Sequence, residues 1–203
     1  PTGMTSHDVV ARVRRAAGMR RVGHAGTLDP LATGLLVLAL GQATRTLEYL
    51  TAQDKGYEAT VRLGASTETY DAEGSVTATH AGPLPDRATV EGALDAFRGA
   101  LLQRPPAYSA LKQGGVPLYE RARRGETVEL PERAVAIYDL LLTAWAPPEL
   151  GLRVHCSKGT YIRSLAHDLG ALLGVGAHLS ALRRTSSGSF RLSDALALAE
   201  IEA

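Results

Sequence analysis

Strict alternation of apolar and polar side chains over residues 55–63 is the feature that most constrains how this chain folds. Every second residue from Tyr57 to Leu63 is apolar, and the residues between them are polar or charged. Because successive side chains of a strand point to opposite faces, this pattern predicts a half-buried strand with one face against a core.

Segments of helical and strand character are mixed along the rest of the chain. We expect helices over 7–17, 43–51, 88–98 and 161–173, strands over 35–40, 134–145 and 151–156, a polar loop over 64–74, and an irregular basic stretch over 104–133. Thr5 and Ser6 can cap the first helix, and Ser193 can cap a final one. Strands and helices without strict alternation predict an α+β fold.

Composition and charge exclude several classes of protein. The 203 residues, of which 45% are hydrophobic, favour one domain with a real core. The net charge of +1 points neither to a nucleic-acid binder nor to a membrane binder, although residues 1–50 carry six Arg against three acids. Cys156 is the only cysteine, which suits a reducing compartment, and the run 35–40 is too short to cross a bilayer. No signal peptide is visible, so we expect a cytoplasmic protein.

The segment Gly23-His-Ala-Gly-Thr-Leu-Asp-Pro-Leu-Ala-Thr-Gly34 is the most informative for chemistry. Pro30 disfavours helical backbone at Asp29, so this carboxylate should lie outside a helix. The glycines allow tight turns and close approach of a ligand. On these residues alone, an Asp that only stabilises a turn is favoured over a displayed reactive group.

The same segment closely resembles the nucleophile motif of TruB-type pseudouridine synthases. Further resemblances to this family follow in order along the chain, at 55–58, 69–74, 106–112, 155–163 and 176–184. The similarity covers about residues 2–191 and implies a pseudouridine synthase fold, a mixed and mostly antiparallel sheet flanked by helices. It also implies an enzyme that converts uridine to pseudouridine at position 55, in the T-loop of tRNA, without metal or cofactor.

The resemblance assigns three catalytic residues. Asp29 is the expected nucleophile, and Arg163 is the expected partner that keeps it ionised and oriented. Tyr57 would stack on the uracil, and its hydroxyl is the candidate group for removing the C5 proton.

Five further residues are expected to bind the substrate. His24 would fill the space that the extruded base leaves, Tyr161 would shape the pocket, and Leu182 would supply an apolar wall. Asp71 belongs to the acidic loop of the family, and Lys112 to a thumb-like insertion over 104–133 that would close on the T-arm of tRNA. Arg121, Arg123 and Arg124 of this stretch could equally form a solvated helix face.

The resemblance also sets expectations for domains and partners. Members begin with an apolar strand and often carry a C-terminal PUA-type domain, and neither is found here, so residues 1–203 are expected to form one catalytic domain. We expect a monomer that acts on tRNA and binds neither a metal nor a membrane.

Three other functions compete with this one. A tRNA-folding helper would have little need to keep Asp29, Tyr57 and Arg163 together. A guide-dependent synthase would usually lack the stretch at 104–133. A hydrolase that uses Asp29 would need a Ser–His pair or a metal cluster, and the sequence suggests neither.

Overall fold

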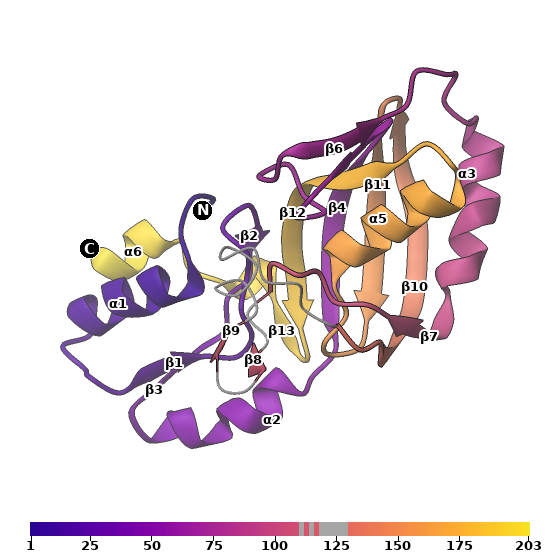
Figure 1. Ribbon diagram of the computed structural model, residues 1–203. Coiled ribbons are helices and arrows are strands. Elements are labelled where there is room, and N and C mark those ends of the chain that lie inside the picture. The colour runs from indigo at the N-terminus through magenta and orange to yellow at the C-terminus, as the bar shows by residue number, and fades with distance from the viewer. Residues whose placement is uncertain (110–111, 114–115, 118–129) are drawn as a thin grey trace. The chain divides into compact units, whose positions relative to one another are not determined.

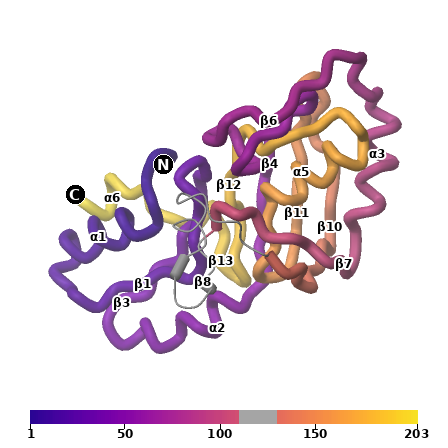
Figure 2. Tube along the Cα trace, viewed as in Figure 1, coloured from indigo at the N-terminus to yellow at the C-terminus, as the bar shows by residue number. Residues whose placement is uncertain are grey.

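The computed structural model describes residues 1–109, 112–113, 116–117 and 130–203. These residues form two compact units, one made of Pro1–Glu58 with Leu182–Ala203 and the other of Ala59–Ala181. The chain passes between the units inside two strands, β4 (Lys55–Leu63) and β12 (Ala177–Ser187). Both chain ends belong to the first unit (Figure 2).

The largest sheet within the described residues has seven strands. Its order is β13-β12-β4-β11-β10-β7, and β2 pairs with β12 in parallel off this path. Strand β10 is antiparallel to both of its neighbours. The remaining strands of this sheet are β2 (Thr33–Gly34), β7 (Gly99–Gln103), β10 (Arg133–Ala146), β11 (Glu149–Cys156) and β13 (Phe190–Arg191).

The core of the second unit lies between this sheet and two helices. Helix α5 (Ile162–Leu172) lies across the sheet, and α3 (Arg87–Leu94), which a short 3-10 turn extends over Asp95–Phe97, packs beside it (Figure 1). The predicted alternation holds in β4, where Ala59, Val61 and Leu63 are buried and Arg62 is exposed. One face of the strand therefore serves the core, as the sequence predicts.

Two short antiparallel strand pairs also lie in the described part of the second unit. Strands β5 (Ala65–Thr67) and β6 (Val76–Thr79) pair with each other, as do β8 (Lys112–Gln113) and β9 (Val116–Pro117). The first hairpin falls partly inside the polar segment that was expected to be a loop. Both strands are short and every residue of β6 is exposed, so no run of apolar residues marks them.

In the first unit, helix α1 (Ser6–Ala16) packs on a two-stranded sheet of β1 (Val22–His24) and β3 (Leu38–Leu40) and on α6 (Leu198–Glu202). The side chain of Thr5 accepts a hydrogen bond from the backbone of Asp8, whose carboxylate accepts one in return, so a capping box starts α1. The remaining helical elements of this unit are the 3-10 helices Gly41–Thr46 and Leu192–Asp194 and helix α2 (Leu47–Thr51).

Comparison with the sequence predictions confirms α1, β4, β10, β11 and α5 to within a residue or two. The segment expected to form a helix over 43–51 contains the end of a 3-10 helix followed by α2. Of the strand expected over 35–40, only residues 38–40 form a strand. Capping by Ser193 is wrong, because its hydroxyl donates to its neighbour Asp194 and the last helix begins at Leu198. No helix among the described residues is long and apolar enough to cross a membrane.

Candidate active site

The loop that carries Asp29 connects β1 to β2 in the first unit. Asp29 lies in neither a helix nor a strand, as Pro30 predicts, and its carbonyl accepts a hydrogen bond from the amide of Ala32 at 2.9 Å. The hydroxyl of Ser6, at the start of α1, accepts a hydrogen bond from the Leu28 amide at 2.8 Å. The Gly3 amide donates to the carbonyl of Pro30 at 2.8 Å. The backbone on both sides of Asp29 is therefore tied to the N-terminal segment.

Three other expected residues also belong to the first unit. Tyr57 is buried at 8% exposure on β4, and Leu182 is buried at 9% on β12. His24 ends β1, and its ring meets the ring of His7 edge to face, with centroids 5.4 Å apart. Burial lowers the pKa of His24, and the nearby positive charges of His7 and Arg184 lower this pKa further. His24 is therefore held towards its neutral form.

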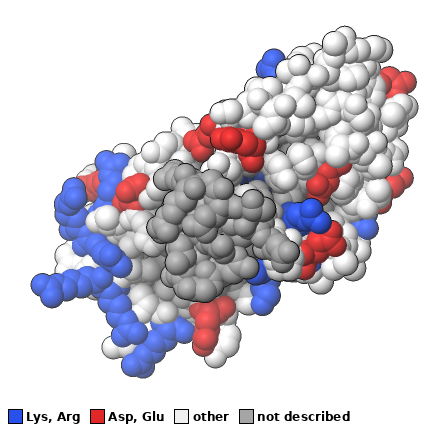
Figure 3. All heavy atoms as spheres, viewed as in Figure 1, with Lys and Arg blue, Asp and Glu red and all other residues white. Residues whose placement is uncertain are grey.

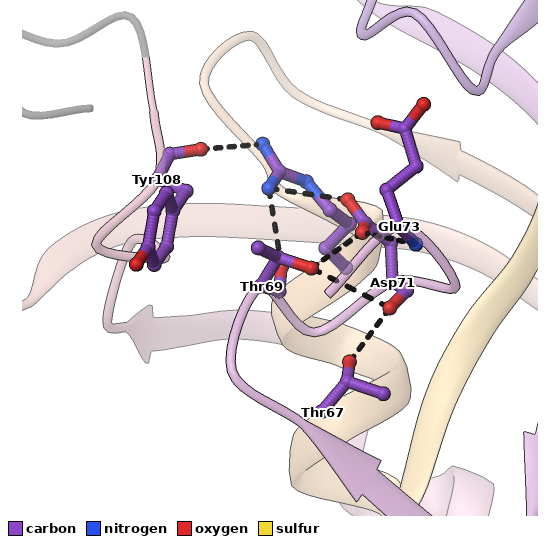
Figure 4. A network of polar contacts seen from close by, with 6 residues as sticks. Thr67, Thr69, Asp71, Glu73 and Tyr108 are labelled. Atoms are coloured by element: carbon purple, nitrogen blue, oxygen red, sulfur yellow. Dashed lines mark hydrogen bonds and ion pairs between the residues drawn. The ribbon is translucent and has the colours of Figure 1, made fainter. Parts of the chain in front are cut away.

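The second unit brings Arg163 and Asp71 together (Figure 4). Arg163 lies in the first turn of α5, and Asp71 lies in the loop between β5 and β6. Nη1 of Arg163 is 3.4 Å from Oδ2 of Asp71, and the two side chains are 5% and 4% exposed. The sequence analysis selected both residues but did not predict that they contact each other.

Backbone carbonyls also bind the two terminal nitrogens of this guanidinium. Nη1 donates to the carbonyl of Thr69 at 3.1 Å, and Nη2 donates to the carbonyl of Tyr108 at 3.0 Å (Figure 4). A buried charge is costly unless it is paired and hydrogen-bonded, so these acceptors are what allow Arg163 to remain charged inside the protein. The side chain is consequently fixed in one orientation.

The acidic loop is organised around the carboxylate of Asp71. Oδ1 accepts hydrogen bonds from the hydroxyl of Thr69 at 2.5 Å and from the amide of Glu73 at 3.1 Å. The hydroxyl of Thr67 donates to the Asp71 carbonyl at 2.7 Å. Sequence analysis missed both threonines, although hydroxyl side chains close to an Asp in a loop are a usual sign of such local bonds.

Tyr70 belongs to the same loop and connects it to helix α5. Its φ of 64° lies in the left-handed region, which is uncommon for a bulky residue. Its ring stacks on that of His167 in α5, with centroids 3.8 Å apart and planes 11° apart. This stack joins the loop to the helix that carries Arg163.

Tyr161 is held at the start of α5 by Gln103 of β7. The Gln103 amide nitrogen donates to the Tyr161 carbonyl at 3.0 Å, and the Tyr161 amide donates to the Gln103 side-chain oxygen at 2.7 Å. Gln103 is 2% exposed, so this paired contact lies in the interior. It fixes the backbone just before Arg163.

Several predicted features of the site are not tested by these contacts. The pairing of Asp29 with Arg163 joins residues of the two units and stays a prediction. The side chain of Lys112 and the residues Arg121, Arg123 and Arg124 lie outside what the structure describes. In the described part of the chain, no group of three or more His, Cys, Asp or Glu side chains is arranged to hold a metal ion.

Solved structures define the fold to which this arrangement belongs. The chain is 34% identical to a chain of a Cbf5-Nop10-Gar1 complex, with a TM-score of 0.73 over 94% of this chain and 47% of that one. It is 30% identical to a chain of an archaeal box H/ACA sRNP Nop10-Cbf5 complex, with a TM-score of 0.74 over 100% and 50%. The chain thus spans about half the length of these solved chains. The α+β fold of the pseudouridine synthases, which the sequence predicts, is confirmed.

Sequence comparison is more specific. The family model described as TruB family pseudouridylate synthase (N terminal domain) matches residues 14–162, and the model described as tRNA pseudouridylate synthase B C-terminal domain matches residues 163–203. The protein named tRNA pseudouridine synthase B in Opitutus terrae is 52% identical over all of this chain and 84% of its own length. The protein of the same name in Syntrophotalea carbinolica is also 52% identical, over 66% of its length. The chain belongs to the TruB family of pseudouridylate synthases.

Removal of the Asp71 carboxylate should destabilise the protein. In the variant Asp71→Ala, the buried Arg163 guanidinium loses its anionic partner, and breaking such a pair costs about 3–5 kcal/mol. Chemical denaturation measures the free energy of unfolding. The matched control is Glu68→Gln, an exposed acid of the same loop, which should unfold like the wild type. Equal stability of Asp71→Ala and wild type would contradict a structural role for the pair.

Stability should also fall as the pH drops below the ordinary histidine pKa of about 6.5. Burial lowers the pKa of His167, as it does that of His24, so the unfolded chain binds protons that the folded protein does not. Where the unfolded state binds more protons, stability rises with pH, and it is therefore lost on acidification. Unfolding measured between pH 7.5 and 5.5 should show a shallower loss for His167→Gln than for the wild type. The matched control is His155→Gln, the same change at an exposed histidine.

Proposed function

We propose that this chain converts uridine to pseudouridine in the T-loop of tRNA, at position 55, with Asp29 as the nucleophile. One observation carries the proposal: the chain matches relatives named tRNA pseudouridine synthase B at 52% identity over its whole length. The reaction class is that of the family. The tRNA substrate, the position and the residue roles are inferred from these relatives and from the site.

The chemistry requires one bond to break and one to form. The N1–C1′ bond of the uridine is cleaved, the base rotates, C5 joins C1′, and the proton on C5 is removed while N1 gains one. A carboxylate that attacks carbon must be ionised and aimed, and the loop of Asp29 has backbone bonds on both sides of that residue. Arg163, which is charged and fixed by its carbonyl acceptors, would hold Asp29 ionised.

Two aromatic side chains would act on the flipped base and on the space that it leaves. Tyr57 would stack on the uracil and use its hydroxyl for the C5 proton, and its burial on β4 suits a desolvated pocket. A uridine within a folded arm must first be extruded, which costs a few kcal/mol of lost stacking and pairing. His24, held towards its neutral form, would fill the vacated space without introducing a charge into the RNA stack.

Exposed arginines support binding to RNA. In the first unit, basic side chains gather over α1 and the segments that follow it (Figure 3). The arginines of residues 1–50 are all exposed and are Arg12, Arg14, Arg15, Arg20, Arg21 and Arg45. A local basic surface is enough to attract phosphates even when net charge is close to zero, as the +1 of this chain is.

A guide-dependent synthase is the second candidate, because the solved neighbours come from H/ACA ribonucleoprotein complexes. The decisive substrate is an isolated T-arm stem-loop, with no guide RNA and no added protein. Conversion of this RNA by the chain alone favours the stand-alone enzyme. Binding without conversion, by the wild type as well as by a longer form of the chain, would favour the guide-dependent or RNA-folding function.

Asp29→Asn should abolish pseudouridine formation on the T-arm stem-loop while RNA affinity stays close to that of the wild type. The amide cannot attack carbon, whereas affinity comes mostly from phosphate and stacking contacts. Product formation and binding are measured in parallel. Turnover by Asp29→Asn would disprove its role as nucleophile.

Tyr57→Phe should keep the RNA affinity and the fold but lose turnover, because the ring still stacks and the hydroxyl is gone. Single-turnover rates with saturating RNA separate this effect from binding. The control is Tyr49→Phe, an exposed tyrosine of α2, which should react like the wild type. A wild-type rate for Tyr57→Phe would remove its hydroxyl from the proton transfer.

A further inference from the structure

Arg184 is the largest fully buried side chain among the described residues, at 1% exposure on β12. Within the described part of the chain it forms no ion pair, and its charge is met by backbone carbonyls instead. An isolated charge is very costly to bury, so a buried arginine requires converging acceptors. These acceptors all come from the segment that contains Asp29.

The guanidinium of Arg184 contacts both flanks of that loop. Nη2 donates to the carbonyl of Gly26 at 3.2 Å and Nη1 to that of Thr27 at 3.4 Å, on the N-terminal side of Asp29. Nε donates to the carbonyl of Leu35 at 2.8 Å, on the C-terminal side. One rigid, planar fork therefore spans the two ends of the loop.

The main chain of Arg184 reinforces the contact. Its carbonyl accepts a hydrogen bond from the Leu35 amide at 2.8 Å, and β2 runs parallel to β12 with Gly34 opposite Arg184. A Cβ atom at Gly34 would lie 2.3 Å from the Arg184 carbonyl oxygen, and Gly34 has a φ of 98°. Only glycine permits this approach, so the end of the loop is in direct backbone contact with β12.

We propose that Arg184 is a positioning residue, which fixes the loop of Asp29 in its reactive geometry by clamping the carbonyls on both sides of it. The inference rests on the proposed function, because it takes Asp29 as the nucleophile. Arg184 itself touches no substrate atom in this scheme. It acts through the backbone, so its loss misplaces Asp29 without removing an RNA contact.

The test compares Arg184→Lys and Arg184→Met with Arg183→Met, whose wild-type side chain is exposed on the same strand. Lysine keeps the charge but presents a single nitrogen, which cannot reach three separate carbonyls. Single-turnover rates at saturating T-arm RNA are measured well below each variant's melting temperature, together with Kd. Both Arg184 variants should react about a hundredfold more slowly, as expected for a misplaced reacting group, with Kd unchanged. Arg183→Met should match the wild type.

Three results would overturn the proposal. One is a wild-type rate in a folded Arg184 variant, and another is a rate loss fully accounted for by the unfolded fraction. Full rescue by lysine would show that charge, and not the fork, matters.

Amide hydrogen exchange keeps the test decisive if the variants do not fold. In the wild type, the amides of Ala32 and Leu35 should exchange slowly, together with β12, because the loop opens only when the clamp does. Exchange as fast as that of an unstructured chain would refute the clamp.

Asp29→Asn is run beside the Arg184 variants to separate the two proposals. An inactive wild type, or an active Asp29→Asn, would defeat the proposed function itself. An active wild type with an inactive Asp29→Asn and fully active Arg184 variants would defeat only the clamp.

Discussion

Burial of positive charge against backbone carbonyls is the constraint on which the loops of Asp71 and Asp29 depend. Arg163 in one unit and Arg184 in the other are 5% and 1% exposed, and each donates to backbone carbonyls outside helices and strands. A guanidinium cannot lose its charge at accessible pH, so it must keep every acceptor in place or pay a large desolvation cost. The loops that supply those acceptors are held as firmly as the arginines.

As a consequence, Asp71 and Asp29, which lie on irregular backbone, belong to loops that hydrogen bonds hold in place. Asp71 lies in a loop organised by Thr69 and braced by the stacked ring of Tyr70. Asp29 lies in a loop whose Leu28 amide donates to the Ser6 hydroxyl and whose Pro30 carbonyl accepts from the Gly3 amide. Catalysis by a fixed nucleophile requires this kind of support, because orientation contributes much of the rate.

Local patterns explain which predictions succeeded. The alternation over 55–63 describes β4 because one face of that strand meets the core. Strand β12 escaped prediction because Arg184 and His178 are buried on it, and charged or polar residues read as solvent-facing. Its burial depends on acceptors that are far away in sequence.

The sequence by itself determined the family, the α+β class and the display of Asp29 outside a helix, because motif residues and the restriction from Pro30 are local properties. Only the tertiary structure decided that Arg163 meets Asp71 and that Arg184 spans the loop of Asp29. Those contacts join residues about 90 to 160 positions apart. They exist because buried charges need partners, and the fold alone determines which carbonyls and carboxylates are within reach.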